Sequence, residues 1–337
     1  MNQAAALVAS LAVYPLKSAR GVPLLSARVE EKGLADDRAM MVVDGEGKAI
    51  TARAAPALMQ VRVVLDGDEV VLFAPGRSPF SFRRSELEPA KGPVAVWGSE
   101  VSAQDGGSAV AAWLSEHLDR PARLVLQDGR RPRMLDLGAG GIVSLADTAP
   151  LLLTNTASLA EINDHLHLPA EMERFRPNVV LEGASAFEED GWGRIRIGEV
   201  EFEVAGPCDR CVMITLDPET GEARSDREPL ALLGKQRRGP DGKVYFGQFL
   251  IPRSEGRIHV GDCIEVAFRQ AVARGFPGHG EQDPAAACLV RRGECKQWRA
   301  PVHLRRHDRR SARPAHIPLQ RPAAIRLCAG PVHHADA

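Results

Sequence analysis

The feature that most constrains the fold is a series of short β-strand patterns that recur at even spacing through the first hundred residues. Each is a stretch of apolar and β-branched residues that ends in turn residues such as Asp44-Gly45-Glu46-Gly47 or Asp66-Gly67-Asp68. The segments are residues 7–13, 27–31, 39–43, 61–65, 69–73, 94–97 and 101–104, the last two flanking Gly98-Ser99-Glu100. Such spacing favours an antiparallel barrel or sandwich.

The chain after residue 104 stays mostly β, with a few helices. Residues 108–118 repeat apolar side chains at helical spacing, and Thr156 is placed to cap a second helix. A third helix is expected at residues 228–237. The expected strands are residues 150–154, 178–182, 194–204 (as a hairpin), 211–216, 244–251, 257–260 and 263–267. The predicted fold class is therefore mostly β with α additions, an α+β protein.

Charge is divided unevenly along the 337 residues, although the formal net charge is only −1. Residues 271–337 carry 12 Lys and Arg against 5 Asp and Glu, whereas the preceding residues are acidic. This Arg, Pro and His-rich tail shows no strand or helix period, so we expect it to be disordered or aberrant. No apolar run is long enough to cross a membrane and no signal peptide is recognisable, which predicts a cytoplasmic protein.

A C-x-x-C pair, Cys208 and Cys211, is the most distinctive chemical motif. A thioredoxin-like redox pair begins a helix, but residues 212–216 have the composition of a strand. A structural zinc site needs about four ligands, and no second pair or nearby histidine pair supplies them. The remaining interpretation is one thiolate offered to a soft metal that needs other ligands, with Arg210 available to hold an anion.

Four motifs, taken together, resemble those of the MOSC proteins, in which a cysteine binds molybdenum cofactor. They are Y-P-L-K-S at residues 14–18, R-F-R-P-N at 174–178, P-C-D-R-C-V-M-I-T-L-D-P-E-T-G at 207–221 and F-G-Q-F at 246–249. The similarity extends over roughly residues 8–266, and the look-alikes are bacterial and mitochondrial reductases of N-hydroxylated compounds. In that family the second cysteine of the pair is the metal ligand, so the resemblance implies Cys211.

The resemblance also implies the groups that contact the cofactor. A pterin with dithiolene sulfurs and a phosphate requires cations and polar groups beside the soft ligand. The residues at matching positions are Lys17, Ser18, Arg38, Arg176, Asn178, Arg210 and Cys211, with Cys211 and Asp147 as catalytic residues. Ordinary structural roles compete with these assignments: Arg38 could pair with Asp36 on the surface, and Asp147 could begin a turn.

The resemblance implies three segments: a MOSC N-terminal β-barrel domain at residues 1–127, a MOSC β-barrel domain that binds molybdenum cofactor at 128–270, and the basic tail at 271–337. Some relatives carry a plant-type iron–sulfur domain at this end. Cys288, Cys295 and Cys328 are too few and wrongly spaced for one.

The function implied is reduction of N-hydroxylated bases and amidoximes to amines. The chain shows no flavin, nicotinamide or intact iron–sulfur motif, so an external electron donor of ferredoxin, flavoprotein or cytochrome type is needed, and no nucleic-acid or membrane partner is expected. Sulfur transfer through a persulfide on Cys211 and simple carriage of the cofactor are the alternatives. Some MOSC domains are joined to desulfurase-like modules, which associates the family with pyridoxal phosphate, but no such module occurs here.

Overall fold

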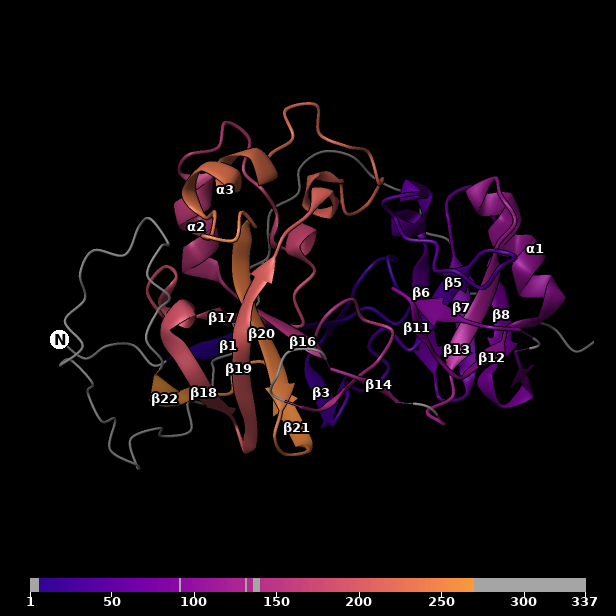
Figure 1. Cartoon of the computed structure of the whole chain (residues 1–337), viewed down its shortest axis with the longest axis horizontal. Coiled ribbons are helices and arrows are strands. Elements are labelled where there is room, and N and C mark those ends of the chain that lie inside the picture. Colours follow the sequence, from indigo (N-terminus) through magenta and orange to yellow (C-terminus); the bar gives the residue numbers. More distant parts are fainter. Residues whose placement is uncertain (1–5, 91, 131, 136–139, 270–337) are drawn as a thin grey trace, which may run out of the picture. The chain divides into compact units, whose positions relative to one another are not determined.

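An eight-stranded sheet organises the half of the molecule that carries the C-x-x-C pair (Figure 1). The computed structural model describes residues 6–90, 92–130, 132–135 and 140–269. The strand order is β2 (Val22–Leu24), β1 (Leu7–Val13), β17 (Val179–Glu182), β16 (Leu151–Asn155), β20 (Tyr245–Pro252), β19 (Val200–Asp209), β18 (Trp192–Ile197) and β22 (Ile264–Arg269). All neighbours are antiparallel except β16 and β17.

The first strands of the chain pair with strands of its second half. Strand β1 pairs with β17, with Leu11 opposite Val179. Strand β3 (Ser26–Glu30) lies between β4 (Gly33–Leu34) and β21 (Gly256–His259) in a three-stranded sheet. Buried aliphatic side chains from the start of the chain and from its second half share one core, which includes Leu11, Ile195 and Ile258. This burial fixes the N-terminal segment beside the second half of the chain.

The N-terminal half builds its own β core from small sheets. One sheet has the order β5 (Met40–Val43), β13 (Arg123–Gln127), β12 (Ala103–Asp105) and β9 (Glu88–Pro89), and a second has β6 (Arg62–Asp66), β7 (Glu69–Phe73) and β8 (Phe80–Arg83). Helix α1 (Gly107–Leu118) buries Val110, Trp113, Leu114 and Leu118 against this core. Three short elements complete it: 3₁₀ helices η1 (Pro56–Gln60) and η2 (Arg84–Glu86) and the hairpin of β10 (Ala95–Val96) and β11 (Ser99–Glu100).

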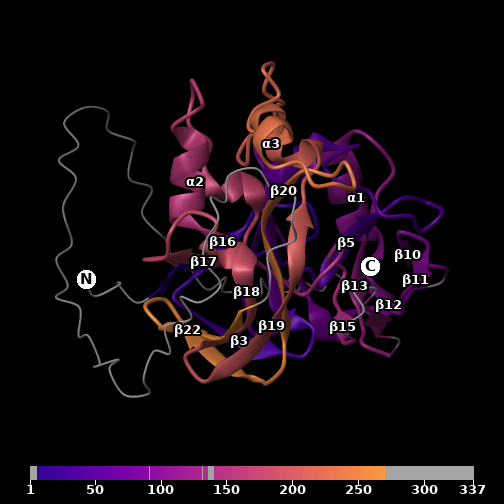
Figure 2. The ribbon, with the colours of Figure 1, turned by 60° about the vertical axis from the view of Figure 1, so that its left-hand side comes forward.

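Short helices cover one end of the large sheet. Helices α2 (Thr156–Asn163) and α3 (Leu230–Gln236) lie at the same end of the sheet in both views (Figures 1 and 2). Ile162, Leu233 and Ile214 pack there around Phe246 of β20. The remaining elements are η3 (Met172–Phe175), η4 (Glu188–Gly191), η5 (Val212–Thr215), β14 (Arg133–Met134) and β15 (Ile142–Val143).

The mostly β fold class with added helices is confirmed, and three local predictions are wrong. Residues 212–215 form the 3₁₀ helix η5 and not a strand, because Ile214 turns inward to the core around Phe246. The hairpin near residue 97 turns at Trp97-Gly98, since both have positive φ. The cap of α2 is Asn155, whose side chain accepts a hydrogen bond from the amide of Ala157.

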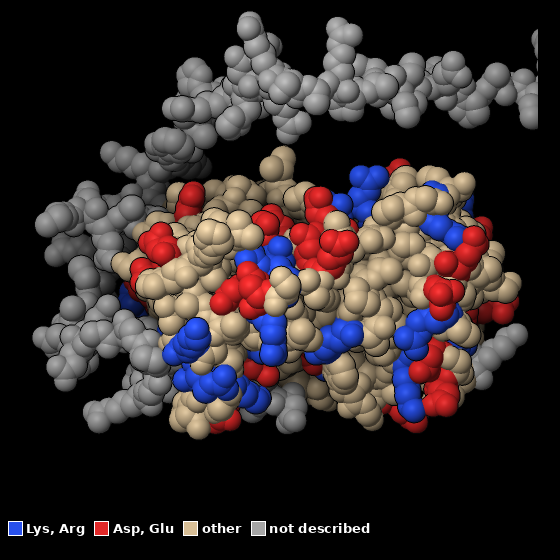
Figure 3. Space-filling model, turned by 90° about the horizontal axis from the view of Figure 1, so that it is seen from above, with Lys and Arg blue, Asp and Glu red and all other residues tan. Residues whose placement is uncertain are grey.

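The domain division at residues 127 and 128 stays a prediction. All described residues belong to one compact unit. The expectation of a disordered or aberrant tail concerns residues 271–337, which lie outside the described residues. No helix among the described residues is both long and apolar enough to span a membrane. Acidic and basic side chains intermingle on the face shown in Figure 3, with no large area of a single sign.

Contacts across the two halves hold the loop that follows the C-x-x-C pair. The backbone of Gly221 approaches Pro56 so closely that a Cβ atom would lie 2.4 Å from the carbonyl oxygen of Pro56, and its φ is +76°. Only glycine satisfies both conditions without strain. The side chain of Gln60 donates a hydrogen bond to the carbonyl of Thr220 at 2.8 Å. The N-terminal half therefore positions the turn beyond Cys211.

A buried carboxyl group lies in η4, next to the start of α2. Glu189 is fully buried and accepts hydrogen bonds from Asn155 at 2.9 Å and Ser158 at 2.7 Å. Burial raises the pKa of Glu189 to about 7, and the neighbouring charge of Asp190 adds to the rise. Because a carboxyl in the unfolded chain has a pKa near 4.3, the folded protein binds more protons between these two values.

We expect the free energy of unfolding to fall as the pH rises from about 4.5 to above 7, by roughly 3 kcal/mol from Glu189 alone. Glu189→Gln removes this decrease, because the amide does not titrate. Urea unfolding at several pH values measures the effect, and Glu182→Gln on the exposed end of β17 is the matched control. A decrease as large in Glu189→Gln as in the wild type would contradict the assignment.

Candidate functional site

The two cysteines of the C-x-x-C pair lie in different environments. Cys208 is buried within β19, and burial raises the pKa of its thiol to about 11. Cys211 is exposed and precedes the first residue of η5. The pair is not joined in a disulfide. Only Cys211 therefore presents a sulfur atom that an external group can reach.

Arg53 is the charged side chain that contacts this sulfur. Its guanidinium donates to Cys211 Sγ at 3.5 Å and to Asp147 Oδ2 at 3.3 Å. It thus links a thiol of the second half to a carboxylate of the segment between β15 and β16. No sequence motif pointed to Arg53, because it lies in an irregular segment after β5 and nothing in its spacing distinguishes it from other surface arginines.

Lys17 and Asp147 form an ion pair at the edge of the same site. The Lys17 ammonium is buried and also donates to the carbonyl of Leu145 at 2.7 Å. Burial lowers the pKa of Lys17 to about 8, although the charge of Asp147 opposes the shift. Burial raises the pKa of Asp147, but Lys17, Trp97 and Arg53 together outweigh it and lower the pKa to about 2. Asp147 is therefore ionised at neutral pH, and Lys17 titrates close to neutral pH.

Two further arginines contact Tyr14. The guanidinium carbons of Arg38 and Arg176 lie 4.3 and 4.2 Å from the centroid of the Tyr14 ring. Arg38 forms an ion pair with Asp37 and donates to the Asn178 side-chain oxygen at 3.1 Å. Burial lowers the pKa of Arg176 to about 10, and the charge of Arg38 adds to this effect. The two cations are thus close enough to repel each other.

Asp36, the surface partner considered for Arg38, pairs with another residue in the structure. Asp36 forms an ion pair with Arg84 at 2.6 Å, whereas Arg38 uses Asp37. The side chain of Asn178 is bonded to other protein groups. Its oxygen accepts hydrogen bonds from Arg38 and from the backbone amide of Leu152, and its nitrogen donates to the carbonyl of Ala12. Its part in the site is to hold Arg38.

Arg210 is turned toward the protein interior. Its guanidinium donates to the carbonyls of Phe246, at 2.9 and 2.7 Å, and of Phe175, at 3.0 Å. It therefore ties the segment between the cysteines to β20. Contact of Arg210 with a cofactor stays a prediction.

Positive charge exceeds negative charge in this site. Five cationic side chains lie here, and Asp37 and Asp147 are the carboxylates that form ion pairs with three of them. We call this set the cationic cluster: Lys17, Arg38, Arg53, Arg133 and Arg176. Arg133 joins it through a hydrogen bond of 2.6 Å to the backbone carbonyl of Asp147. An anion placed here would relieve the mutual repulsion of these groups.

Unusual backbone conformations gather at the same place. Ser18, Arg38, Trp97 and Arg176 are four of the eight non-glycine residues with positive φ among those described, at +67°, +47°, +50° and +56°. Residues with a Cβ atom rarely adopt positive φ, and those that do are concentrated at binding and catalytic sites. Ser18 is also buried, directly after Lys17. The backbone thus supports the view that this surface is built for a ligand.

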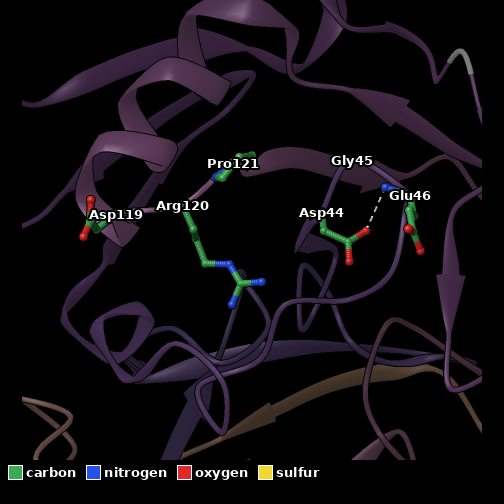
Figure 4. Close-up of a pocket in the computed structure, with 6 residues that line it drawn as sticks. All are labelled: Asp44, Gly45, Glu46, Asp119, Arg120 and Pro121. Carbon is green, nitrogen blue, oxygen red and sulfur yellow. Dashed lines mark hydrogen bonds between the residues drawn. The ribbon is translucent and has the colours of Figure 1, made fainter.

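A separate open depression of about 670 Å³ lies in the N-terminal half (Figure 4). It is lined by Asp44, Gly45, Glu46, Asp119, Arg120 and Pro121. The amide of Glu46 donates to the Asp44 carboxylate at 2.9 Å, which is a local turn contact. The depression holds no nucleophile and shares no residue with the cationic cluster, so it is not the candidate site.

Comparisons with known proteins match the sequence of this chain to one family. The family model "MOSC N-terminal beta barrel domain" matches residues 5–121, and the model "MOSC domain" matches residues 140–265. Human mitochondrial amidoxime-reducing component 1 is 34% identical over 282 residues, which cover 76% of this chain and 82% of the relative. Rat mitochondrial amidoxime reducing component 2 is 34% identical over 285 residues, with the same coverage. The zebrafish component 1 is 33% identical over 273 residues, covering 77% and 84%.

Proposed function

The chain belongs to the family of proteins that join a MOSC N-terminal β-barrel domain to a MOSC domain, and on that premise we propose that it is a molybdenum cofactor-dependent reductase of N-hydroxylated compounds. The relatives named above are amidoxime-reducing components. Their names support an N-hydroxylated substrate and an external electron donor for this protein as well.

One observation carries the proposal: the exposed Cys211 thiol lies at the edge of the cationic cluster. A thiolate is a suitable ligand for a soft metal, and guanidinium groups suit the phosphate of a pterin. The excess of cations over carboxylates in the cationic cluster fits an anionic group in the same place. The residues present therefore fit molybdenum cofactor, with Cys211 as the metal ligand and Arg38, Arg176 and Arg53 as anion contacts.

The reaction takes up two electrons and two protons per substrate. The N–O bond breaks, one proton goes to the nitrogen, and the other goes to the oxygen, which leaves as water, so that an amidoxime becomes an amidine. When bound, the cofactor supplies a metal that changes oxidation state by two electrons. An electron-donor protein of ferredoxin, flavoprotein or cytochrome type replaces those electrons.

Within this chain, Lys17 is the group that holds a proton near the thiol, and Asp147 is its ion-pair partner. Asp147 is ionised at neutral pH and cannot donate a proton by itself, whereas Lys17, with a pKa of about 8, is protonated and close to its titration. A group with such a pKa is a suitable general acid near neutral pH. We assign the proton to the Lys17–Asp147 pair, in which half-exposed Asp147 faces the substrate. A cytoplasmic location remains a prediction.

The direct test is an anaerobic assay of the protein purified from a host that makes molybdenum cofactor. Dithionite-reduced methyl viologen serves as the electron donor and benzamidoxime as the substrate. We expect benzamidine to form in proportion to oxidised viologen, one benzamidine for two electrons. Bound cofactor without turnover would instead indicate a carrier, and a persulfide on Cys211 without molybdenum would indicate sulfur transfer.

A further inference from the structure

An aromatic side chain stands exposed beside the reactive groups. Trp97 has 57% of its surface exposed, and among the described residues Trp97 and Phe268 are the exposed large aromatic side chains. Phe268 lies on β22 at the far edge of the large sheet, whereas Trp97 contacts the cationic cluster. We propose that Trp97 is a platform on which the aromatic ring of a flat N-hydroxylated substrate stacks, an inference that rests on the proposed function.

A two-residue turn presents this side chain. Trp97 and Gly98 connect β10 to β11, and both have positive φ, +50° and +82°. This is the turn in which Asn-Gly is the usual pair, because asparagine tolerates the left-handed region. A large aromatic residue is poorly suited to that conformation, and more than half of its surface stays exposed here. Strain of this kind is typical of a residue that serves a ligand.

Contacts with the reactive groups fix the indole ring. Its Nε1 donates to Asp147 Oδ1 at 3.1 Å, and the Arg53 guanidinium lies 4.8 Å from the ring centroid. The Lys17 ammonium lies 5.9 Å from the same ring. Arg53 in turn contacts Cys211. A ligand that rests on Trp97 therefore lies beside the Lys17–Asp147 pair, and Arg53 lies between it and the Cys211 thiol.

The chemistry of the platform selects a class of substrate. An indole ring stacks with flat π systems, so it favours aryl amidoximes and N-hydroxylated heteroaromatic bases over aliphatic amidoximes with the same N–O group. Asp147 and the cations beside the ring remain able to contact the polar end of the substrate. Trp97 thus sets the preference among N-hydroxylated compounds and does not take part in breaking the N–O bond.

The test compares benzamidoxime with acetamidoxime in the viologen assay. Trp97→Asn removes the ring but suits the turn, and Trp97→Phe keeps a ring but lacks Nε1. We expect the ratio of kcat/KM for benzamidoxime to that for acetamidoxime to fall about tenfold in Trp97→Asn and to stay within about threefold of the wild-type value in Trp97→Phe. Phe268→Ala is the matched control, an exposed aromatic residue removed outside the site, and it leaves the ratio unchanged. Thermal unfolding confirms that each variant is folded.

Two outcomes overturn the platform while leaving the reductase function intact. One is an unchanged ratio in Trp97→Asn. The other is an equal decrease in kcat/KM for both substrates in Trp97→Asn and in Trp97→Phe, which would mean that Trp97 acts only through its hydrogen bond to Asp147.

Equilibrium binding separates the two proposals if the wild type reduces neither substrate. Calorimetric titration of the holoprotein with benzamidine and acetamidine requires no turnover. A loss of about tenfold in benzamidine affinity in Trp97→Asn, with no such loss for acetamidine, supports the platform even though the reductase assignment fails. Equal affinities in the wild type and Trp97→Asn overturn it.

Discussion

Replacing Cys211 by serine is expected to lower amidoxime reduction to the background of the assay, a loss of at least about 10³-fold. Cys211 is the exposed thiol of the pair and the one that Arg53 contacts. A serine hydroxyl does not ionise near neutral pH and is a poor ligand for a soft metal. Initial rates of benzamidine formation with reduced methyl viologen measure the change.

Cys208→Ala is the matched control for that experiment. Cys208 is three residues away in the same motif, but it is buried and its thiol stays protonated. We expect the variant to lose about 1 to 2 kcal/mol of stability, because a buried side chain becomes smaller, and to keep its reductase rate within about threefold. A variant Cys208→Ala that is folded but inactive, beside an active Cys211→Ser, would reverse the assignment of the two cysteines.

Replacing Lys17 by methionine is expected to lower kcat by about 10² to 10³-fold, with a smaller effect on KM. The side chain remains similar in length, but the proton of the buried ammonium is lost, and general acid groups contribute on this scale. In the wild type we expect kcat to fall as the pH rises through about 8, because the protonated form of Lys17 is the active form and its pKa is about 8. The methionine variant has no such decrease.

Asp147→Asn tests the coupling within the pair. The charge of Asp147 raises the pKa of Lys17 against the effect of burial. Its removal therefore moves the alkaline decrease in kcat to lower pH. Circular dichroism and thermal unfolding check that both variants are folded. If Lys17→Met kept the wild-type decrease near pH 8, another group would have to be the proton source.

The sequence was sufficient for the fold class. Turn residues and alternating apolar residues are local signals, so the short strands and α1 could be recognised from them. The conformation after Cys211 could not be recognised from such local signals. Residues 212–215 are β-branched and apolar in composition, but Ile214 turns into the core around Phe246 of β20, and that tertiary contact decides for a 3₁₀ helix.

The site itself was only partly predictable, because its geometry depends on contacts between distant segments. The motifs pointed to Lys17, Arg38, Arg176 and Cys211. They gave no indication of Arg53 or Trp97, which reach the site from different loops of the N-terminal half. The sequence also could not show that Asn178 and Arg210 spend their hydrogen bonds on protein groups, since that depends on which carbonyls the fold brings near them.

The most direct measurement of the central claim is the molybdenum and pterin content of the protein, purified from a host that makes the cofactor, beside the Cys211→Ser variant. The account predicts about one molybdenum and one pterin per wild-type chain, and molybdenum lost from the variant. Molybdenum retained in full by Cys211→Ser would contradict Cys211 as the ligand. A wild-type protein without molybdenum or pterin, carrying a persulfide on Cys211, would contradict the reductase proposal and favour sulfur transfer.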